Sequence, residues 1–335
     1  PARRAAGAAP LTTMAFALAL LVALAIDRWW GEPRARAHPV VWIGNYLGWV
    51  ATWVQHGTQP QAAKQDLPAF WRGAVAWCVG AAWVAALAWV LQIALLALPW
   101  WAAGIGLGVL LKPLLAWAML RDEVRAVESA LGKSLQAGRE RLRWLVSRDV
   151  AQLSATEVRE SAIETLAENL NDSVVAPIFW FVLLGLPGVA LYRFANTADA
   201  MWGYPGVYKG RNWAWAGKWA ARADDVLSWL PARITAVLLL LAAGWNGLSR
   251  AGTLAQEAHK TPSPNSGWPM AAMALNLGVA LRKPGVYVLN PQGKPVTAAH
   301  TALALRFASK ALLALVLCAQ IAMILVAFLS KGISP

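Results

Sequence analysis

Acidic side chains are scarce in this sequence, and most of them fall in one segment. The chain has 17 Asp and Glu residues among 335, and more than half of them lie between Asp122 and Asp172. Residues 154–157 read Ser-Ala-Thr-Glu. This is the pattern of a capping box, in which the Ser and Glu side chains bond to the free amides at a helix start. A helix is therefore predicted to begin here.

The helix that follows carries carboxylates every fourth residue, and residues four apart share one helical face. They are Glu160, Glu164, Glu168 and Asp172. One interpretation is a solvated face, but such faces mix charge signs, because like charges at this spacing repel by about 0.2–0.5 kcal/mol per pair. The other is a functional site. We favour it for Glu168 and Asp172, which approach an apolar run where carboxylates pair with cations, metals or amines.

Three further polar clusters follow along the chain. Asn196 and Asp199 are three residues apart in an expected helix, so both can reach one ligand. Arg222 and Asp225 have the same spacing, and an internal ion pair explains them equally well. Residues 263–269 form a turn-rich loop before an apolar helix, where free amides can bind an anion or the loop is a plain turn.

The composition indicates that lipid surrounds much of the chain. Hydrophobic residues make up 58% and charged residues 14%, whereas soluble domains average about 45–50% and about 25%. The net charge of +13 comes from 30 Lys and Arg against 17 acids. These cations flank apolar runs, as expected for loops on the cytoplasmic side. No nucleic-acid-binding motif accompanies them, so nucleic acid is not an expected partner.

We therefore expect an all-α, polytopic helical membrane protein with interfacial and loop helices, forming one membrane domain over residues 1–335. A span needs about 20 apolar residues. The expected spans are 11–26, 73–98, 100–120, 174–192, 230–245 and 311–329. The polar loops between them are 27–72, 121–173, 193–229 and 246–310.

Two of these spans are interrupted. The run 174–192 contains Pro177 and a Gly-Leu-Pro-Gly stretch at 185–188. Such a break is tolerated in the membrane only where protein or a cavity satisfies the backbone. Lys112 and Pro113 interrupt the third span, which suggests that it faces protein. Either 174–192 does not fully cross, or the polar residues meet at membrane depth; both arrangements stay open.

Aromatic residues indicate the membrane interface. Residues 40–54 place Trp and Tyr three and four apart, which suits a helix lying in the interface. Residues 268–281 are expected to be re-entrant or interfacial. Trp residues also end several apolar runs, as in an aromatic belt: Trp29, Trp30, Trp71, Trp100, Trp101, Trp229 and Trp245. Cys78 and Cys318 lie within apolar runs and are expected to be small buried hydrophobes.

Together these motifs resemble the CobD/CbiB family, the membrane-bound adenosylcobinamide-phosphate synthases of cobalamin biosynthesis. The motifs run in the family's order and cover most of residues 27–280. They are D-x(3)-G-[DE]-P at 27–33, HPV-x-x-IG at 38–44, ENL-x-D-x-VVAP at 168–177, NT-x-D-x-M-x-GY at 196–204, the run from Tyr208 to Arg233, and SPN-x-GWP at 263–269.

The resemblance implies an ATP-dependent carboxylate–amine ligase. It would join adenosylcobyric acid, an adenosylated corrinoid, to 1-aminopropan-2-ol or its O-phosphate, with ATP and Mg²⁺, in the inner (plasma) membrane. A carboxylate-rich pocket suits an ammonium nucleophile that must lose a proton. The implied catalytic residues are Glu168, Asp172, Asn196, Asp199 and Asp225, with Glu168, Asp172 and Asp199 as metal ligands. The implied substrate contacts are Asp27, His38, Glu164, Asn169, Tyr204, Lys209, Arg222, Asp224, Arg233 and Asn265, with Lys209, Arg222 and Arg233 as phosphate contacts.

The sequence also departs from the pattern. It has no G-x-x-x-x-G-K-[ST] P-loop to support ATP binding. Glu32 stands where Asp is expected, and Met270 stands where an acid is common. An AmpE-like signalling or sensor protein on the same scaffold is the alternative function, and a transporter is a third, although no inverted repeat is visible. The form of the amine, and whether a partner subunit or a homo-oligomer is needed, stay open.

Overall fold

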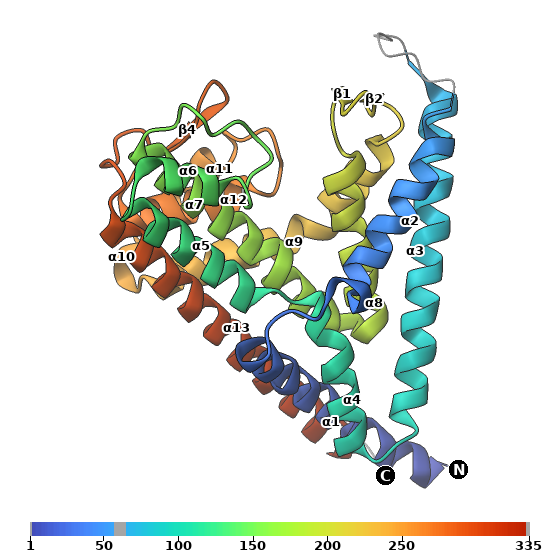
Figure 1. The fold of residues 1–335 in the computed structure, drawn as a ribbon. Coiled ribbons are helices and arrows are strands. Elements are labelled where there is room, and N and C mark those ends of the chain that lie inside the picture. The colour runs from blue at the N-terminus through green and yellow to red at the C-terminus, as the bar shows by residue number, and fades with distance from the viewer. Residues whose placement is uncertain (1, 57–64, 333–335) are drawn as a thin grey trace. The chain divides into compact units, whose positions relative to one another are not determined.

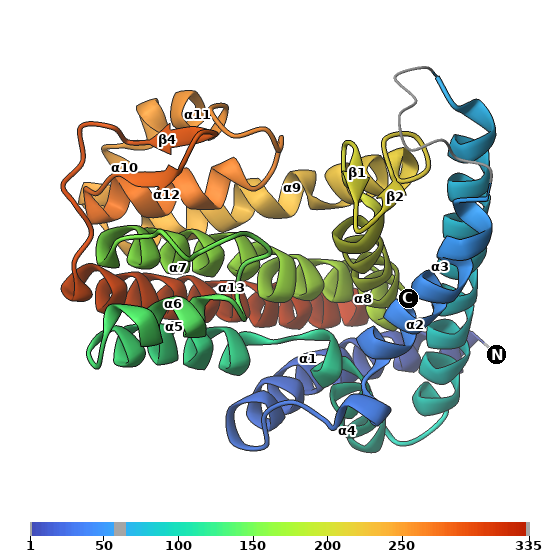
Figure 2. The same cartoon turned by 45° about the horizontal axis from the view of Figure 1, so that its top comes forward.

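The structure is a computed structural model that describes residues 2–56 and 65–332, and it is almost entirely helical (Figures 1 and 2). The strands within these residues form two short hairpins. Six helical stretches are long and apolar enough to cross a membrane. They are Leu11–Trp29, Leu67–Leu96, Trp100–Leu131, Ala155–Trp202, Lys218–Ala242 and Ala298–Leu329. The expected all-α, multi-pass membrane fold is therefore confirmed.

The chain divides into two compact units that use alternating segments of sequence. The first unit comprises residues 1–115, 177–227 and 319–335, and the second comprises 116–176 and 228–318. One boundary falls between residues 115 and 116, and the other three fall inside helices α8 (Ala176–Trp202), α9 (Lys218–Ala242) and α13 (Ala298–Gly332). The expectation of one membrane domain stays a prediction, and each unit is described by itself below.

In the first unit, α1 (Ala2–Trp29) packs against α4 (Trp100–Leu111) through glycines. A Cβ atom on Gly104 would lie 2.8 Å from Leu18 Cδ2, and one on Gly108 would lie 2.7 Å from Val22 Cβ and 2.8 Å from the Ala19 carbonyl oxygen. Small residues allow backbones to approach this closely in membrane helices, where dispersion contacts must hold the pair.

The third expected span differs in detail from the prediction. Helix α4 ends at Leu111, a 3-10 turn covers Lys112–Leu114, and α5 (Trp117–Leu131) begins a new helix. Pro113 explains the break, because proline lacks an amide hydrogen and its ring clashes with the preceding turn. Lys112 is 2% exposed, so the expectation that this interruption faces protein is confirmed.

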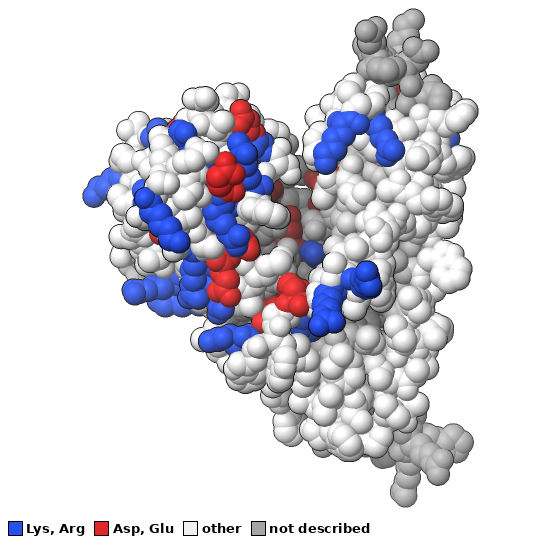
Figure 3. All heavy atoms as spheres, in the orientation of Figure 1, with Lys and Arg blue, Asp and Glu red and all other residues white. Residues whose placement is uncertain are grey.

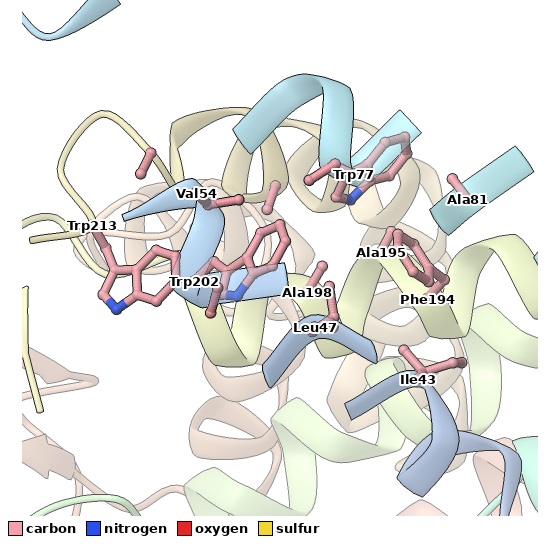
Figure 4. Packing of buried hydrophobic residues seen from close by; sticks show 14 of the residues in the cluster. Ile43, Leu47, Val54, Trp77, Ala81, Phe194, Ala195, Ala198, Trp202 and Trp213 are labelled. Carbon is pink, nitrogen blue, oxygen red and sulfur yellow. The ribbon is translucent and has the colours of Figure 1, made fainter. Parts of the chain in front are cut away.

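Helix α2 (Pro39–Val54) packs one face against α3 (Leu67–Leu96) and α8 in a buried cluster, as Figure 4 shows. Its Tyr46 hydroxyl donates to the Ala76 carbonyl oxygen at 2.8 Å. Trp77 of α3 meets Phe194 of α8 edge to ring, with centroids 5.7 Å apart. The opposite face of α2 exposes Trp42, Trp49 and Trp53. The predicted helix is confirmed, and only its outer face is free for lipid.

The broken run forms the first part of α8, which is kinked at Gly185 (φ 68°, ψ −152°). Only glycine adopts this conformation readily. The Leu186 amide freed by the kink donates to Gln92 Oε1 of α3 at 2.8 Å. Pro187 has no amide hydrogen to satisfy. A neighbouring helix thus satisfies the backbone, as expected for an interrupted helix in a membrane.

After α8 the chain forms an antiparallel hairpin of β1 (Val207–Tyr208) and β2 (Arg211–Asn212), which pairs Val207 with Asn212 and Tyr208 with Arg211. A tight turn then leads into α9. Trp202 and Trp213 stack beside this turn, with centroids 5.6 Å apart and rings inclined by 14°. Close packing here needs small residues, because a Cβ on Gly73 of α3 would lie 1.9 Å from the Ala216 carbonyl oxygen.

In the second unit, α7 (Ala155–Leu170) and the π-turn Asn171–Val175 lie at the centre. Helices α5, α6 (Leu135–Leu142) and α12 (Gly267–Leu277) contact α7, as does strand β3 (Leu281–Lys283), which pairs with β4 (Tyr287–Leu289). The short helices α10 (Trp245–Leu248) and α11 (Ala251–Ala258) precede α12. Every residue of α12 except Trp268 is buried. It is therefore a core helix of this unit, and the expected re-entrant or interfacial placement of residues 268–281 stays a prediction.

Exposed apolar side chains cover the candidate spans. Residues 73–111 contain no charged residue, and the surface over the lower part of α3 is uncharged in Figure 3. Trp29, Trp30 and Trp245 are among the most exposed hydrophobic residues, at 72%, 76% and 83%, which fits an aromatic belt. Cys78 and Cys318 are exposed rather than buried, because both project from the outward faces of apolar helices.

We predict that Gly108→Ala destabilises the first unit, because the added methyl would overlap Val22 and the Ala19 carbonyl. Overpacking of this kind costs about 1–3 kcal/mol, which thermal denaturation in detergent would detect. Gly252→Ala is the matched control, since nothing lies within 4 Å of its Cβ position in α11. Equal melting temperatures for the two variants would contradict the tight α1–α4 packing.

Candidate functional site

Helix α7 begins as its sequence predicts. The Ser154 hydroxyl accepts from the Glu157 amide at 3.3 Å, and Glu157 Oε2 accepts from the Ser154 amide at 2.7 Å. These two bonds satisfy orphan amides reciprocally. They fix the helix start, and therefore set which residues of the following turns face the interior.

The carboxylates of α7 are not a solvated face. Glu160 is 0% exposed and Glu164 is 4% exposed, while Glu168 and Asp172 are half-buried. Neither oxygen of Glu160 and only one of Glu164 has a hydrogen-bond partner among the described residues. Burying carboxylates in this way costs free energy unless cations compensate them. The solvated-face interpretation is therefore wrong for Glu160 and Glu164.

Cations from two distant segments surround this carboxylate stripe. Arg148 donates to Glu164 Oε2 at 3.3 Å and also to the Ser161 hydroxyl. Arg282 of strand β3 places its Nε 3.9 Å from Glu160 Oε1. The charge of Lys283, also on β3, acts on Glu164. The β3–β4 hairpin thus brings positive charge to a helix more than 100 residues earlier in the sequence.

Tyr287 of strand β4 also lies beside the carboxylate stripe. Its hydroxyl donates weakly to Met270 Sδ at 3.6 Å. Burial raises the pKa of Tyr287 well above its ordinary value, and the negative charges of Glu164 and Glu168 raise it further. Its phenol therefore stays protonated at neutral pH and offers a hydrogen-bond donor beside the stripe.

The stripe ends in a π-turn, which shifts the direction of the last carboxylate relative to a regular helix. Asn171 donates to Asp172 Oδ1 at 2.8 Å and accepts from the Thr235 hydroxyl of α9 at 3.1 Å. Asn169 donates to the Thr165 carbonyl oxygen. π-turns often occur at functional sites, and this one includes Asp172, the last carboxylate of the stripe.

Arg159 stands outside the stripe, as its position predicts. It forms a two-pronged pair with Glu128 of α5, with Nε–Oε distances of 3.0 Å and an Nη2–Oε1 distance of 2.8 Å. Thr301 of α13 donates to the same carboxylate at 3.0 Å. This network joins α5, α7 and α13, and Arg159 therefore stabilises the packing of these helices.

The loop at 263–269 forms a turn that its own side chains stabilise, and its binding of an anion stays a prediction. The Ser263 hydroxyl accepts from the amides of Asn265 and Ser266 at 3.2 Å. Arg233 of α9 donates to Asn265 Oδ1 at 2.6 Å, and its guanidinium lies 4.6 Å and 4.7 Å from the ring centres of Trp229 and Trp268. Arg233 and Asn265 therefore hold each other in place, and the expected phosphate contact of Arg233 stays a prediction.

The first unit holds a second charged cluster, built around Lys112. Its ammonium lies 3.1 Å from Asp27 Oδ1 and 2.7 Å from Glu32 Oε1. His38 Nε2 lies 3.2 Å from Glu32 Oε2, and His38 Nδ1 accepts from the Val40 amide, which caps α2. The expected substrate contacts Asp27 and His38 are thus joined through Glu32 and Lys112.

The end of α8 carries Asn196 and Asp199, both half-buried. Arg193 donates to Asn196 Oδ1 at 3.4 Å. A Cβ on Gly203 would lie 1.9 Å from Asp199 Oδ1, so the Asp199 carboxylate lies directly over this glycine. Tyr204 stacks on Tyr208 with centroids 3.6 Å apart, and Lys209 lies over the Tyr208 ring at 5.2 Å.

The first turns of α9 hold Arg222, Asp224 and Asp225. Arg222 is exposed and both carboxylates are half-buried. The positive charge of Arg222 acts on Asp225, as the ion-pair interpretation of this spacing expects. A role for Arg222 or Asp225 toward a ligand stays a prediction.

The predicted site residues therefore fall into two sets. The first unit holds Asp27, His38, Asn196, Asp199, Tyr204, Lys209, Arg222, Asp224 and Asp225. The second holds Glu164, Glu168, Asn169, Asp172, Arg233 and Asn265. Among the described residues, no three His, Cys, Asp or Glu side chains gather in a metal-binding group. A site made from Glu168, Asp172 and Asp199 stays a prediction.

Sequence reasoning missed several residues of these clusters. The sequence favours Glu168 and Asp172 as functional residues, yet Glu160 is the most buried member of the stripe. No sequence pattern pointed to Arg148, Arg282 or Tyr287, because each lies in an irregular segment or a short strand outside α7. Lys112 did give a signal, since a lone cation inside an apolar run implies a buried partner.

Comparisons with known proteins agree with the motifs. The family model described as CobD/Cbib protein matches residues 20–318. A probable cobalamin biosynthesis protein CobD of Methanothermobacter thermautotrophicus is 39% identical over 282 residues, covering 81% of this chain and 85% of that protein. The cobalamin biosynthesis protein CobD of Halalkalibacterium halodurans is 35% identical over 280 residues, covering 81% and 82%. That of Brucella suis is 34% identical over 296 residues, covering 83% and 87%. No solved structure matches this chain.

We predict that Lys112→Met strongly destabilises the protein, because Asp27 and Glu32 would lose their shared ammonium. Breaking a buried ion pair costs about 3–5 kcal/mol, measurable by denaturation in detergent. The exposed Lys133→Met is the control, and a surface change of this kind stays within about 0.5 kcal/mol. Similar losses in the two variants would show that the Lys112 cluster does not stabilise the fold.

We also predict that Tyr287 makes stability fall in alkaline solution. Its raised pKa keeps the folded form protonated while the unfolded chain ionises near pH 10, so stability present below about pH 10 is lost above it. Tyr287→Phe should lose less stability than wild type between about pH 9 and pH 11. The same alkaline loss in Tyr287→Phe and wild type would count against the burial of this phenol beside Glu164.

Proposed function

Because the chain belongs to the CobD/CbiB family, we propose that it is a biosynthetic enzyme of cobalamin biosynthesis that forms an amide bond. The proposed reaction joins a carboxylate of adenosylcobyric acid to the amine of 1-aminopropan-2-ol or its O-phosphate, using ATP and Mg²⁺. The inner (plasma) membrane is the proposed location. The family match over residues 20–318 carries this proposal.

The stripe on α7 supports the proposal through its charge. An amine attacks a carbonyl only after it loses a proton, and a carboxylate nearby can both hold the ammonium and accept that proton. Glu168 and Asp172 are half-buried, at the more accessible end of the stripe. Glu160 and Glu164 lie deeper, so they would add negative potential without touching the substrate.

The hydrogen-bond donors and cations beside the stripe suit the activated carboxylate, which is the other reactant. An activated carboxylate develops negative charge on oxygen as the amine adds, and preorganised donors lower the cost of that charge. Tyr287 offers a protonated hydroxyl beside Glu164 and Glu168. Lys283 is exposed on the same hairpin and can reach a phosphate. We therefore assign Glu168 to the amine, and Tyr287 and Lys283 to the oxygen-bearing groups.

The residues also fit Mg²⁺ in the way that nucleotide-dependent enzymes bind it. Mg²⁺ keeps several waters and is bound by one or two carboxylates together with substrate phosphates, rather than by an all-protein cage. Asp172 would supply a protein oxygen while Glu168 faces the amine, and no all-protein cage is then required. When bound, the ion would screen the phosphate charge of ATP.

We predict that Glu168→Gln lowers amide formation by about a hundredfold or more, the effect typical of losing a general base. Purified protein in detergent would be supplied with adenosylcobyric acid, ATP, Mg²⁺ and either form of the amine, and product would be followed by mass. Glu140→Gln is the matched control, because Glu140 is exposed and pairs only with neighbours on α6 and Arg143.

The outcomes separate the alternatives. Product from wild type and from Glu140→Gln, but not from Glu168→Gln, supports the ligase and this site. Full activity of Glu168→Gln overturns the assignment of the stripe. A folded wild type that makes no product with either amine contradicts the proposed reaction and leaves the AmpE-like signalling role as the next candidate to test.

A further inference from the structure

A groove of about 410 Å³ lies within the second unit, between α5 and the first part of α13, which lie side by side in Figures 1 and 2. Pockets of about 300–1,000 Å³ commonly hold small ligands. None of the residues assigned to the proposed reaction lines this groove. Its polar wall includes Arg125, Glu128 and Ser129 of α5 and Thr301, Arg306 and Ser309 of α13.

The carboxylates beside this groove are bound by other cations. Arg159 forms a two-pronged pair with Glu128, with Nε–Oε distances of 3.0 Å, and Thr301 donates to the same carboxylate. Earlier on α5, Asp122 accepts hydrogen bonds from Nε and Nη2 of Arg121 at 2.9 Å and 3.2 Å. Each carboxylate thus has an arginine from outside the groove wall. Its charge therefore leaves that of the wall largely uncancelled.

Two guanidinium groups of the wall can therefore bind a ligand. Arg306 is exposed, and its side chain forms no hydrogen bond or ion pair with another residue in the described part of the chain. Arg125 is 58% exposed, and its bond to Asp122 at 3.3 Å uses one of its five N–H donors. Guanidinium groups bind phosphate through paired N–H donors. The wall therefore offers a site for a phosphate group.

The face of α13 that lines the groove continues into an apolar surface. Leu313 and Leu317 follow Arg306 by seven and eleven residues, which places all three side chains on one helical face. The two leucines are 60% and 53% exposed. Residues 311–329 carry no charge and form the last expected span. Arg306 lies five residues before this run, about 7.5 Å along the helix axis, where a cation reaches the level of lipid headgroups.

We propose that this groove binds an anionic membrane phospholipid, such as phosphatidylglycerol. Arg125 and Arg306 hold its phosphate, and its acyl chains lie along Leu313 and Leu317. Basic pockets between membrane helices bind anionic headgroups in this way. A choline headgroup would bring a further positive charge to the two guanidinium groups. A soluble phosphate could contact the same arginines but would leave the apolar face uncovered.

The test is a lipid competition, read by native mass spectrometry of the protein in detergent. Phosphatidylglycerol and phosphatidylcholine with identical acyl chains would be added in equal amounts. The attraction of two arginines to an anionic lipid should retain phosphatidylglycerol about tenfold over phosphatidylcholine, which corresponds to about 1.4 kcal/mol. In a parallel series, excess inorganic phosphate should displace no more lipid than sodium chloride of equal ionic strength, which controls for screening.

Charge variants locate the headgroup. The double variant Arg125→Gln with Arg306→Gln should lower the preference for phosphatidylglycerol to near one. Arg306→Gln alone should lower it in part, and this change removes no contact with another described residue, so the fold should be unaffected. Arg143→Gln is the matched control, because it removes the same charge from an exposed arginine outside the groove. It should bind lipid as wild type does.

A second pair of variants tests the groove itself without changing any charge. Ala302 is exposed in the groove wall, so Ala302→Trp should fill the groove and remove the preference for phosphatidylglycerol. Ala299→Trp is the control, because Ala299 is exposed on the same helix outside the wall. It should keep the preference.

Three results would overturn the proposal. Equal retention of the two lipids by wild type removes the anionic preference. An unchanged preference in the double arginine variant or in Ala302→Trp places the lipid elsewhere. Displacement of the lipid by inorganic phosphate, but not by sodium chloride, assigns the groove to a soluble phosphate ligand.

Discussion

Burying charge in a mostly apolar chain is the constraint on which the rest of this structure depends. Only 14% of the residues are charged, and several of them lie inside helices that otherwise suit a membrane. A buried charge must have partners, since its desolvation costs several kcal/mol. Lys112 therefore lies between Asp27 and Glu32, and Arg159 forms a two-pronged pair with Glu128. Each pair joins segments that are distant in sequence.

The same constraint shapes the proposed active site. The stripe on α7 concentrates negative charge, and the second unit surrounds it with Arg148, Arg282 and Lys283 from a loop and a hairpin. The compensation is incomplete, because Arg282 Nε stays 3.9 Å from Glu160 Oε1, and neither oxygen of Glu160 has a hydrogen-bond partner within the described part of the chain. A site left with excess negative potential suits a cationic amine, which connects the electrostatics of the fold to the chemistry proposed for the family.

The helices support these clusters by close packing and by satisfying backbone groups. Glycines let α4 approach α1, and Gln92 accepts the amide freed by the kink at Gly185. Neither the glycine packing nor the Gln92 hydrogen bond involves the residues assigned to the reaction. Both are needed because helices in lipid gain little from burial against one another and cannot leave backbone amides unsatisfied.

The sequence by itself determined the class of the fold, the approximate spans and the start of α7, because hydropathy and helix capping are local properties. It also identified the motifs that place the chain in its family. Only the tertiary structure decided that Glu160 and Glu164 are buried, and that Arg148, Arg282 and Tyr287 surround them. It also decided that α12 is a core helix and that Lys112 joins Asp27 to Glu32. Burial and ion pairing depend on which distant segments come together, and neither residue spacing nor composition specifies that pairing.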